Sequence, residues 1–317
     1  MSSAADPEPS SDPGTNRRER FALASAGVPF RLKVALVWLV IFALLGGLFA
    51  AAQFDTQWMQ DNLTFIAAGL KYTLIIAVCG IALAITLAAL GALGRLSSNS
   101  IANGISGFYV SFFRGTPLIL QMFLLYLALP QVGVNLVQKY SGVPDGLASA
   151  LTLQAVVAGT LALGLNYGAY MTEIFRAGIQ SVSAGQFEAA EALGMTYVQK
   201  MRRVVLPQAF RVIIPPTGNE FIAMMKDTAL VSFLGVTAAS AEIFRRSQLV
   251  GKAEFKNLEA YVVAAGIYWA LTAIFTFFQG RLESRLLQGY VRDRGHVIPS
   301  RHKPTAVDQA ALLEGSS

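Results

Sequence analysis

The stretch that decides the fold is SAGQFEAAEALGMTYVQKMRRVVLPQAF, residues 183–210. It carries six ionisable side chains and lies between two long hydrophobic runs. In the whole chain of 317 residues only 14% are charged and 54% are hydrophobic, whereas a soluble domain has about 25% charged residues. The sequence therefore predicts an integral membrane protein that contains an inserted, soluble helical hairpin.

Two short helices are expected within this stretch. Capping boxes predict their starts, one formed by Ser183 with Gln186 and the other by Thr196 with Gln199. Gly194 lies between them, where a helix end favours a residue that can adopt a positive φ.

The second expected helix is amphipathic. The basic residues Lys200, Arg202 and Arg203 lie largely off an apolar stripe with i, i+4, i+7, i+8 spacing. That stripe consists of Tyr197, Met201, Val204 and Val205. Physical reasoning leaves two roles open, a hairpin lying on the anionic inner leaflet and a docking element for a cytoplasmic partner.

Outside the hairpin the chain reads as an all-α membrane fold with about six transmembrane helices. Each run is close to the roughly 20 residues that cross a bilayer. The runs are residues 34–52, 69–93, 117–136, 153–175, 204–225 and 258–278. The first run is longer than the apolar part of a signal peptide, about 7 to 15 residues, so it is expected to stay uncleaved. Pro207, Pro215 and Pro216 predict that the fifth span is kinked or broken.

The distribution of basic residues predicts the orientation. Of the 25 lysines and arginines, 17 fall in segments expected inside the cell and 5 in segments expected outside. This bias places both termini in the cytoplasm.

Residues 1–30 have the composition of a disordered tail, and residues 288–317 form a second cytoplasmic tail. Four of the five outer cations lie in residues 227–257, which are expected to form a short external helix or a re-entrant piece.

The hairpin resembles the EAA loop of ATP-binding cassette (ABC) importer permeases, whose pattern is EAA, three residues, G, nine residues, then I-x-L-P. The one departure is Val204 in place of isoleucine. The matching positions are Glu188, Ala189, Ala190, Gly194, Leu206 and Pro207. The resemblance implies that residues 183–207 dock into a cleft on a cytoplasmic ATPase subunit and pass its motion to the membrane helices.

Further segments resemble the polar amino acid permeases. They are YVSFFRGTPLILQMFLLYLALP (109–130), YGAYMTEIFRAGIQSVSAGQFEAA (167–190) and LPQAFRVIIPPTGNEFIAMMKDTALVS (206–232). The resemblance covers residues 65–287, which would form a five-span core, with residues 31–53 as an additional N-terminal transmembrane helix.

This family resemblance implies a function and a set of partners. The chain would be the multi-pass permease of an ATP-driven importer in the cytoplasmic membrane, moving glutamate, glutamine, arginine, histidine or a similar amino acid. A second permease copy or paralogue, ABC ATPase subunits and an extracytoplasmic solute-binding protein would be its partners, and no nucleic acid is expected.

The chain is not expected to be an enzyme by itself. Its only Gly-Lys pair, Gly251-Lys252, lacks the rest of a Walker A motif. The ATPase is therefore a separate subunit, and ATP would be used there, with no cofactor in this chain. Both histidines, His296 and His302, lie in the C-terminal tail, which argues against a metal site in the membrane.

Charged residues within spans are costly and usually functional. Glu220, Lys226 and Asp227 are therefore candidates for the substrate pathway, together with Arg114 and Thr116 at the start of the third span. A pathway with both signs of charge suits a zwitterionic amino acid. The structural alternatives are an ion pair between Lys226 and Asp227, and a snorkelling role for Arg114.

Two further features are expected to be structural. Glu173 and Arg176 are expected to pair near the inner end of the fourth span or to contribute to the coupling surface. Gly164 and Gly168 form a G-x-x-x-G pattern that allows close helix packing.

The rival function is a stand-alone secondary transporter or channel for small polar solutes. That class predicts an inverted sequence repeat and ionisable residues spread over several spans. The sequence has no clear repeat, and its charge within spans is concentrated on the fifth. A membrane-embedded enzyme is disfavoured because no convincing catalytic cluster is found.

Overall fold

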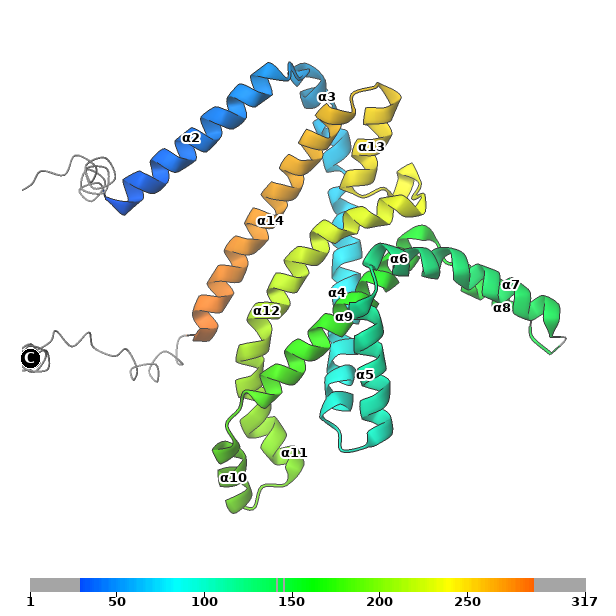
Figure 1. Ribbon diagram of the computed structural model, residues 1–317, viewed down its shortest axis with the longest axis vertical. Coiled ribbons are helices and arrows are strands. Elements are labelled where there is room, and N and C mark those ends of the chain that lie inside the picture. Colours follow the sequence, from blue (N-terminus) through cyan, green and yellow to red (C-terminus); the bar gives the residue numbers. More distant parts are fainter. Residues whose placement is uncertain (1–28, 141, 145, 288–317) are drawn as a thin grey trace, which may run out of the picture. The chain divides into compact units, whose positions relative to one another are not determined.

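The structure, a computed structural model, describes residues 29–140, 142–144 and 146–287 (Figure 1). Every regular element within these residues is a helix, which confirms the predicted all-α fold. The expected tails, residues 1–30 and 288–317, lie outside the described part apart from Pro29 and Phe30. The chain divides into two units, residues 1–57 and 58–317, and each is described by itself.

The first unit contains α2, Phe30–Ala51, a helix of 22 residues. At 1.5 Å per residue it is about 33 Å long, enough to cross a hydrocarbon core of about 30 Å. None of its residues is buried, and its exposed side chains are mostly aliphatic or aromatic. Such a surface suits contact with lipid, and α2 falls on the expected first span.

The second unit consists of long helices joined by short ones. The long elements are α4 (Leu70–Leu96), α5 (Ser100–Gly115), α9 (Ala155–Gln180), α12 (Leu206–Asp227) and α14 (Asn257–Leu287). The shorter ones are α3 (Thr56–Ala67, which begins in the first unit), α6 (Leu118–Phe123), η1 (Leu124–Ala128), α7 (Leu129–Lys139), α8 (Gly146–Leu151), α10 (Ala184–Ala192), α11 (Tyr197–Lys200), η2 (Met201–Val205), η3 (Thr228–Leu234), η4 (Ala238–Ser240) and α13 (Ile243–Ala253).

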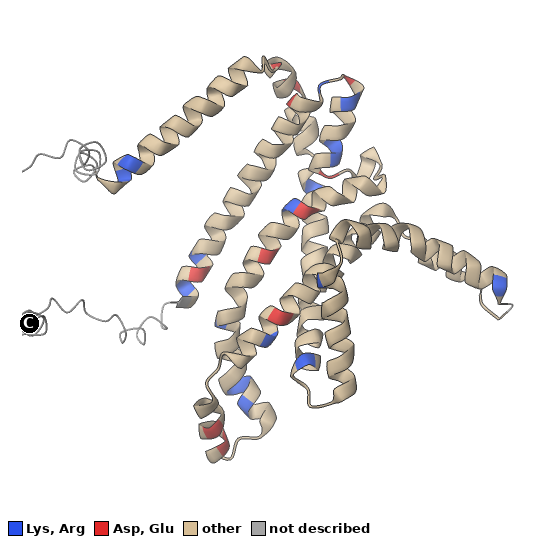
Figure 2. Ribbon diagram, viewed as in Figure 1, with Lys and Arg blue, Asp and Glu red and all other residues tan. Residues whose placement is uncertain are grey.

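Four stretches of the described chain are long and apolar enough to cross a membrane. They are Phe30–Ala51, Thr56–Leu96, Leu118–Lys139 and Asn257–Leu286. The expected fourth and fifth spans fall on α9 and α12, which are long enough but are not among these four. Charged residues lie at several places along α12, and near the C-terminal end of α9 (Figure 2). The count of six spans therefore stays a prediction.

The core of the second unit forms where α4 packs against α9. A Cβ atom on Gly164 would lie 2.8 Å from Cγ of Leu83, and one on Gly168 would lie 3.0 Å from Cβ of Leu87. Only glycine leaves room for such a close approach. Lipid supplies no hydrophobic force between helices, so close packing of this kind is what holds them together. The G-x-x-x-G pattern is therefore a packing face, as expected.

The adjacent prolines do not break α12, which continues from Leu206 to Asp227. Pro215 and Pro216 remove two backbone donors from the helix. Packing against α14 supports the helix here. Gln279 donates a hydrogen bond of 2.8 Å to the carbonyl of Pro215, and the rings of Phe221 and Phe275 meet edge to face. Of the two expectations for this span, a kink or a break, the break was wrong.

Residues 228–257 form a packed helical segment rather than a plain loop. Glu242 is fully buried at the start of α13, where its carboxylate accepts hydrogen bonds of 2.6 Å from the backbone N–H groups of Phe244 and Arg245. The cations have structural partners as well. Arg245 donates to the carbonyl of Val236 and Arg246 to that of Ala241. Two of the cations in this segment, which the sequence places outside, therefore have a structural role.

The contact between α4 and α9 can be tested by adding one methyl group. We expect Gly164→Ala to lower the free energy of unfolding by about 1–3 kcal/mol, because the new methyl overlaps Leu83. Gly266→Ala on α14 is the matched control, since a Cβ there meets nothing within 4 Å. Thermal unfolding of the detergent-solubilised protein measures both. Equal melting temperatures for the two variants would contradict this packing.

Candidate functional site

The hairpin turns at Gly194, which has a φ of +72°. The N–H of Gly194 donates to the carbonyl of Glu191 (2.9 Å), and the N–H of Met195 donates to that of Ala190 (3.1 Å). These two bonds form a Schellman motif, which ends a helix on a residue in the left-handed conformation. A residue with a side chain would be strained here, as the sequence indicated.

One of the two predicted capping boxes is present. Thr196 and Gln199 exchange both bonds at the start of α11. The box at Ser183 was wrong, since Ser183 is the N-cap of α10 but its side chain accepts no hydrogen bond there. The reason is that the side-chain carbonyl of Gln186 accepts from Gln208 instead. This contact ties α10 to α12.

The second hairpin helix is continuous with the membrane helix that follows. α11 passes through a wide π-helical turn, Met201–Val205, into α12. A π-helical turn shifts the register of the residues on either side of it. Val205 is consequently buried while Tyr197 is 67% exposed, so the predicted stripe does not form a single face. Lys200, which the sequence groups with Arg202 and Arg203 off the apolar stripe, also differs from them, because it is only 8% exposed.

An ion pair links the two helices of the hairpin, between the buried Lys200 and the exposed Glu191. Nζ of Lys200 lies 2.8 Å from Oε1 of Glu191. The hydrogen bond and the charge of Lys200 lower the pKa of Glu191 below its ordinary value of 4.5. A carboxylate with a lowered pKa stabilises the fold at pH values above its ordinary pKa. This contribution is lost as the pH falls through the lowered pKa. The pair is therefore fully formed at neutral pH.

The motif residues divide into packing and surface positions. Ala190 is buried, and Val204 and Leu206 are half-buried, whereas Glu188, Ala189 and Pro207 are exposed. Three apolar side chains next to the turn are also exposed, and we call them the hairpin tip. They are Leu193 (77%), Tyr197 (67%) and Val198 (71%).

A cavity of about 550 Å³ lies between α5, α6, α9 and α12. Its lining residues are Arg114, Gly115, Thr116, Pro117, Leu118, Asn166, Tyr167, Tyr170, Glu220 and Asp227. Four of the five residues predicted for the substrate pathway are thus brought together, Arg114 from α5, Thr116 from the position that follows α5, and Glu220 and Asp227 from α12. The fifth, Lys226, is exposed and is not among the lining residues.

Both signs of charge are held in place within this cavity. An oxygen of Asp227 accepts a hydrogen bond of 2.8 Å from the hydroxyl of Tyr167. The guanidinium carbon of Arg114 lies 5.1 Å from the ring centre of Tyr170, within the range of cation–π attraction. Among the described residues no ion pair joins Lys226 to Asp227, so the structural alternative for these two residues does not hold.

Side-chain amides support the part of the cavity wall that Asn166 and Thr116 line. Asn166 donates to the carbonyl of Phe113 (2.9 Å) and to the side chain of Gln121 (3.1 Å). Gln121 in turn donates to the hydroxyl of Thr116 (2.8 Å). These bonds fix Thr116 and so the start of α6. Sequence reasoning missed Asn166, Tyr167 and Tyr170 as lining residues, although polar side chains inside an apolar span are a usable signal.

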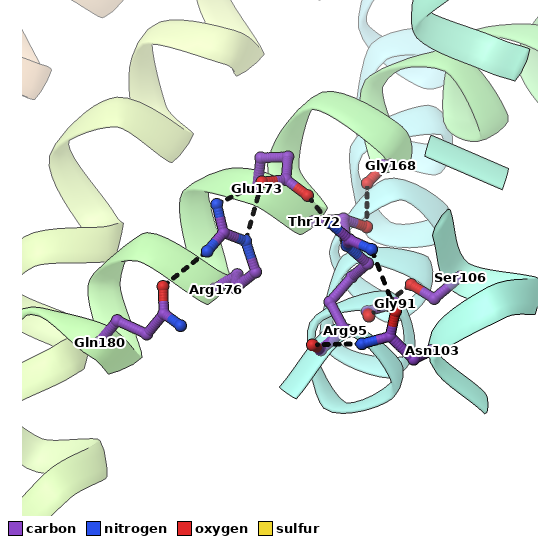
Figure 3. Close-up of polar contacts among 9 residues, drawn as sticks. All are labelled: Gly91, Arg95, Asn103, Ser106, Gly168, Thr172, Glu173, Arg176 and Gln180. Atoms are coloured by element: carbon purple, nitrogen blue, oxygen red, sulfur yellow. Dashed lines mark hydrogen bonds and ion pairs between the residues drawn. The ribbon is translucent and has the colours of Figure 1, made fainter. Parts of the chain in front are cut away.

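A polar network links α4, α5 and α9 beyond the cavity (Figure 3). Glu173 and Arg176 form an ion pair of 2.7 Å, as predicted. Nε of Arg95 lies 3.5 Å from the same carboxylate, and Nη1 of Arg95 donates to the side chain of Asn103 (3.3 Å). The end of α9 that leads into the hairpin is therefore attached to the ends of its neighbours.

Residues 80–288 match the family of binding-protein-dependent transport system inner membrane components. The chain is 37% identical over 239 residues to PatM, a probable amino-acid ABC transporter permease protein of Vibrio harveyi, covering 75% of this chain and 99% of PatM. It is 34% identical over 286 residues to ArgU, an arginine transport system permease protein of Corynebacterium glutamicum, covering 89% of this chain and 84% of ArgU.

A solved structure gives the same result. It is described as a crystal structure of an amino acid ABC transporter with histidines, and it is 33% identical with a TM-score of 0.63, covering 74% of this chain and 99% of its own. Permease subunits of this kind are not enzymes themselves, and they are multi-pass membrane proteins that work with ATPase subunits and a second permease. The chain therefore belongs to the binding-protein-dependent transport system inner membrane components, as an ABC importer permease of the polar amino acid type.

Proposed function

We propose that this chain is the permease of an ATP-driven importer that moves polar or charged amino acids across the cytoplasmic membrane. The observation that carries the proposal is the hairpin, an exposed, internally braced element that is continuous with two helices of the cavity wall. Both termini would lie in the cytoplasm, as the bias of basic residues predicts, and the hairpin would then face the ATPase.

The hairpin is connected so that its motion reaches the cavity. α9 leads into α10 through only residues 181–183, and α11 runs through the π-helical turn into α12. α9 contributes Asn166, Tyr167 and Tyr170 to the cavity, and α12 contributes Glu220 and Asp227. A force on the hairpin would therefore displace both walls together.

The hairpin tip supplies the surface on which an ATPase would act. Large apolar side chains that are exposed next to charged residues are typical of a groove-binding helix. Leu193, Tyr197 and Val198 meet this description, and the exposed Glu188 and Arg202 lie close to them in the sequence. ATP binding would close two ATPase subunits on two such hairpins and open the pathway outward, and hydrolysis would reset it.

The cavity suits the two charges of an amino acid. Arg114 would bind the carboxylate, and Asp227 with Glu220 would bind the ammonium group. Its volume of about 550 Å³ is within the range of about 300–1,000 Å³ common for small-molecule sites. The name of ArgU and the mention of histidines in the solved structure favour arginine and histidine as substrates, with glutamate and glutamine as further candidates. An extracytoplasmic solute-binding protein would deliver them.

The coupling role of the turn is tested by Gly194→Asp. We expect this variant to insert normally but to lose uptake almost completely, because aspartate is strained at a φ of +72° and adds a charge to the docking surface. Gly104→Asp is the control, since Gly104 is exposed on α5 and a Cβ there meets nothing within 4 Å. Uptake of radiolabelled amino acid by cells measures both. Normal uptake by the Gly194 variant would rule out the coupling role.

The substrate role of the cavity is tested by Asp227→Asn. The amide still accepts the hydrogen bond from Tyr167, but the charge that would bind the ammonium group is lost. A hydrogen bond to a charged group is worth about 1.5–3 kcal/mol, so we expect KM for uptake to rise about 10- to 100-fold. Lys226→Gln, at the exposed neighbour, should change KM far less. If the two variants have equal KM values, the cavity is not the pathway.

The hairpin's internal brace is tested by comparing two variants. Glu191→Gln leaves Lys200 buried without its charged partner, so we expect faster trypsin cleavage at Arg202 and Arg203 and slower uptake. The double variant Glu191→Gln/Lys200→Met has no unpaired charge at this place. It should therefore recover much of the resistance to trypsin and much of the uptake rate. A double variant that is no better than Glu191→Gln alone would show that the ion pair does not brace the hairpin.

A further inference from the structure

Glu242 is the one acidic side chain among the described residues that is fully buried, and the proposed pathway does not use it. It caps the start of α13. Burial raises its pKa to about 7, although its hydrogen bonds act in the opposite direction. The fold therefore holds the carboxyl neutral below this pH. It loses stability as the pH rises through the raised pKa, because a buried charge then appears.

The three hydrogen-bond partners of Glu242 show what a proton on it would change. Its carboxylate accepts from the backbone N–H groups of Phe244 and Arg245, at 2.6 Å each, and from the hydroxyl of Tyr268 on α14, at 2.8 Å. A protonated carboxyl must itself donate, and of the three partners only the hydroxyl can accept. A proton on Glu242 would therefore reverse the bond to Tyr268 and turn the hydrogen of Tyr268 toward another acceptor.

Such an acceptor lies just past the end of α12. The hydroxyl of Tyr268 also forms a hydrogen bond with the side chain of Thr228. Thr228 is fully buried, and its hydroxyl donates to the carbonyl of Met225 at 2.8 Å. With Glu242 neutral, each O–H donates to the next group, from the carboxyl through Tyr268 and Thr228 to this carbonyl. We call this series the hydroxyl chain. It is interrupted when Glu242 ionises, because Tyr268 then donates to the carboxylate.

The hydroxyl chain ends beside the candidate site. Asp227 directly precedes Thr228 and is the last residue of α12. Its carboxylate accepts a hydrogen bond of 2.8 Å from the hydroxyl of Tyr167, and both residues line the cavity. The last turn of α12 is thus held at two points, by Tyr167 from α9 and by the hydroxyl chain from α14. When the second support is lost, the carboxylate of Asp227 is placed less firmly.

The groups around Glu242 and Tyr268 come from several elements. They are Arg245 from α13 itself, Thr73 from α4, Thr228 from η3 and the apolar Ile66 from α3. Arg245 donates to the carbonyl of Val236 at 2.8 Å, and an arginine keeps its charge at every pH of interest. Thr73 leads to α4, which does not line the cavity. Thr228 is therefore the group through which a proton on Glu242 reaches the cavity.

We propose that Glu242 is a positioning residue for the substrate pathway, and that its neutral carboxyl acts through the hydroxyl chain to hold Asp227 where it binds the ammonium group of an amino acid. The inference rests on the proposed function, in which the cavity is the pathway. Binding is then tight while Glu242 is protonated and weakens as it ionises. Coupling between two sites usually changes affinity by a factor of about 5 to 150. We expect the lower end, about fivefold, because one of the two supports remains.

The test measures equilibrium binding by the complete purified transporter in detergent, without the solute-binding protein, so that binding by that protein does not contribute. The probe is radiolabelled arginine, whose guanidinium keeps its charge at every pH used. For the wild type we expect Kd to rise about fivefold between about pH 5.5 and pH 8.5, with its midpoint at about 7. Glu242→Gln keeps a side-chain donor beside Tyr268 at every pH, so its Kd should stay near the low-pH value of the wild type.

Two further variants cut the hydroxyl chain but leave Glu242 able to titrate. Tyr268→Phe and Thr228→Val each remove one hydroxyl with little change in shape, and each should give a Kd that stays near the high-pH value of the wild type. The matched control is Thr272→Val on α14, since the hydroxyl of Thr272 donates to the backbone carbonyl of Tyr268 at 2.9 Å. This control should keep the wild-type pH dependence. Thermal unfolding of the same samples shows whether each variant is folded.

Several results would overturn the role of the hydroxyl chain. A wild-type Kd that does not change with pH would leave Glu242 a purely structural role, even if the melting temperature changes. Persistence of the pH dependence in Glu242→Gln, Tyr268→Phe or Thr228→Val would contradict the role as well, and the last two variants decide the question even if Glu242→Gln fails to fold. A wild-type transporter that binds none of arginine, histidine, glutamine and glutamate at any pH would overturn the proposed function, and this role with it.

Discussion

The contact of α4 with α9 is the constraint on which the rest of this structure depends. In a membrane the helices gain nothing by leaving lipid for one another, so they must gain from packing. Gly164 and Gly168 allow the two backbones to approach until Leu83 and Leu87 fill the space between them. With one side of α9 held in this way, its polar residues Tyr167 and Tyr170 line the cavity. The position of α9 therefore determines both the core and the candidate site.

The same helix connects the site to the hairpin. Glu173, on α9 beyond the cavity, is bound by Arg176 and lies close to Arg95 of α4. α10 follows a few residues later, and the pair of Glu191 with Lys200 makes the hairpin a single braced element. Because α11 continues into α12, the hairpin is attached to two walls of one cavity. This connectivity is the physical basis of the proposed coupling between a cytoplasmic ATPase and the pathway.

Much of this architecture is local and could be predicted from the sequence. The apolar runs, the turn at Gly194 and the capping box at Thr196 each depend on a few neighbouring residues. The failures involve contacts between distant segments. Gln186 binds Gln208 rather than capping its own helix, and a π-helical turn moves Tyr197 away from the face of Val205. The cavity brings Asp227 to Tyr167, a pairing of two helices that no spacing in the sequence reveals.

The central claim is that the hairpin joins this chain to a separate ATPase, and affinity purification from detergent-solubilised membranes tests it most directly. The tagged wild-type chain is purified, and its partners are identified by mass spectrometry. The account predicts an ABC ATPase in stoichiometric amounts together with a second permease chain. Recovery of this chain alone, under conditions in which a known permease–ATPase complex stays together, would contradict the account and favour a hairpin that lies on the membrane surface.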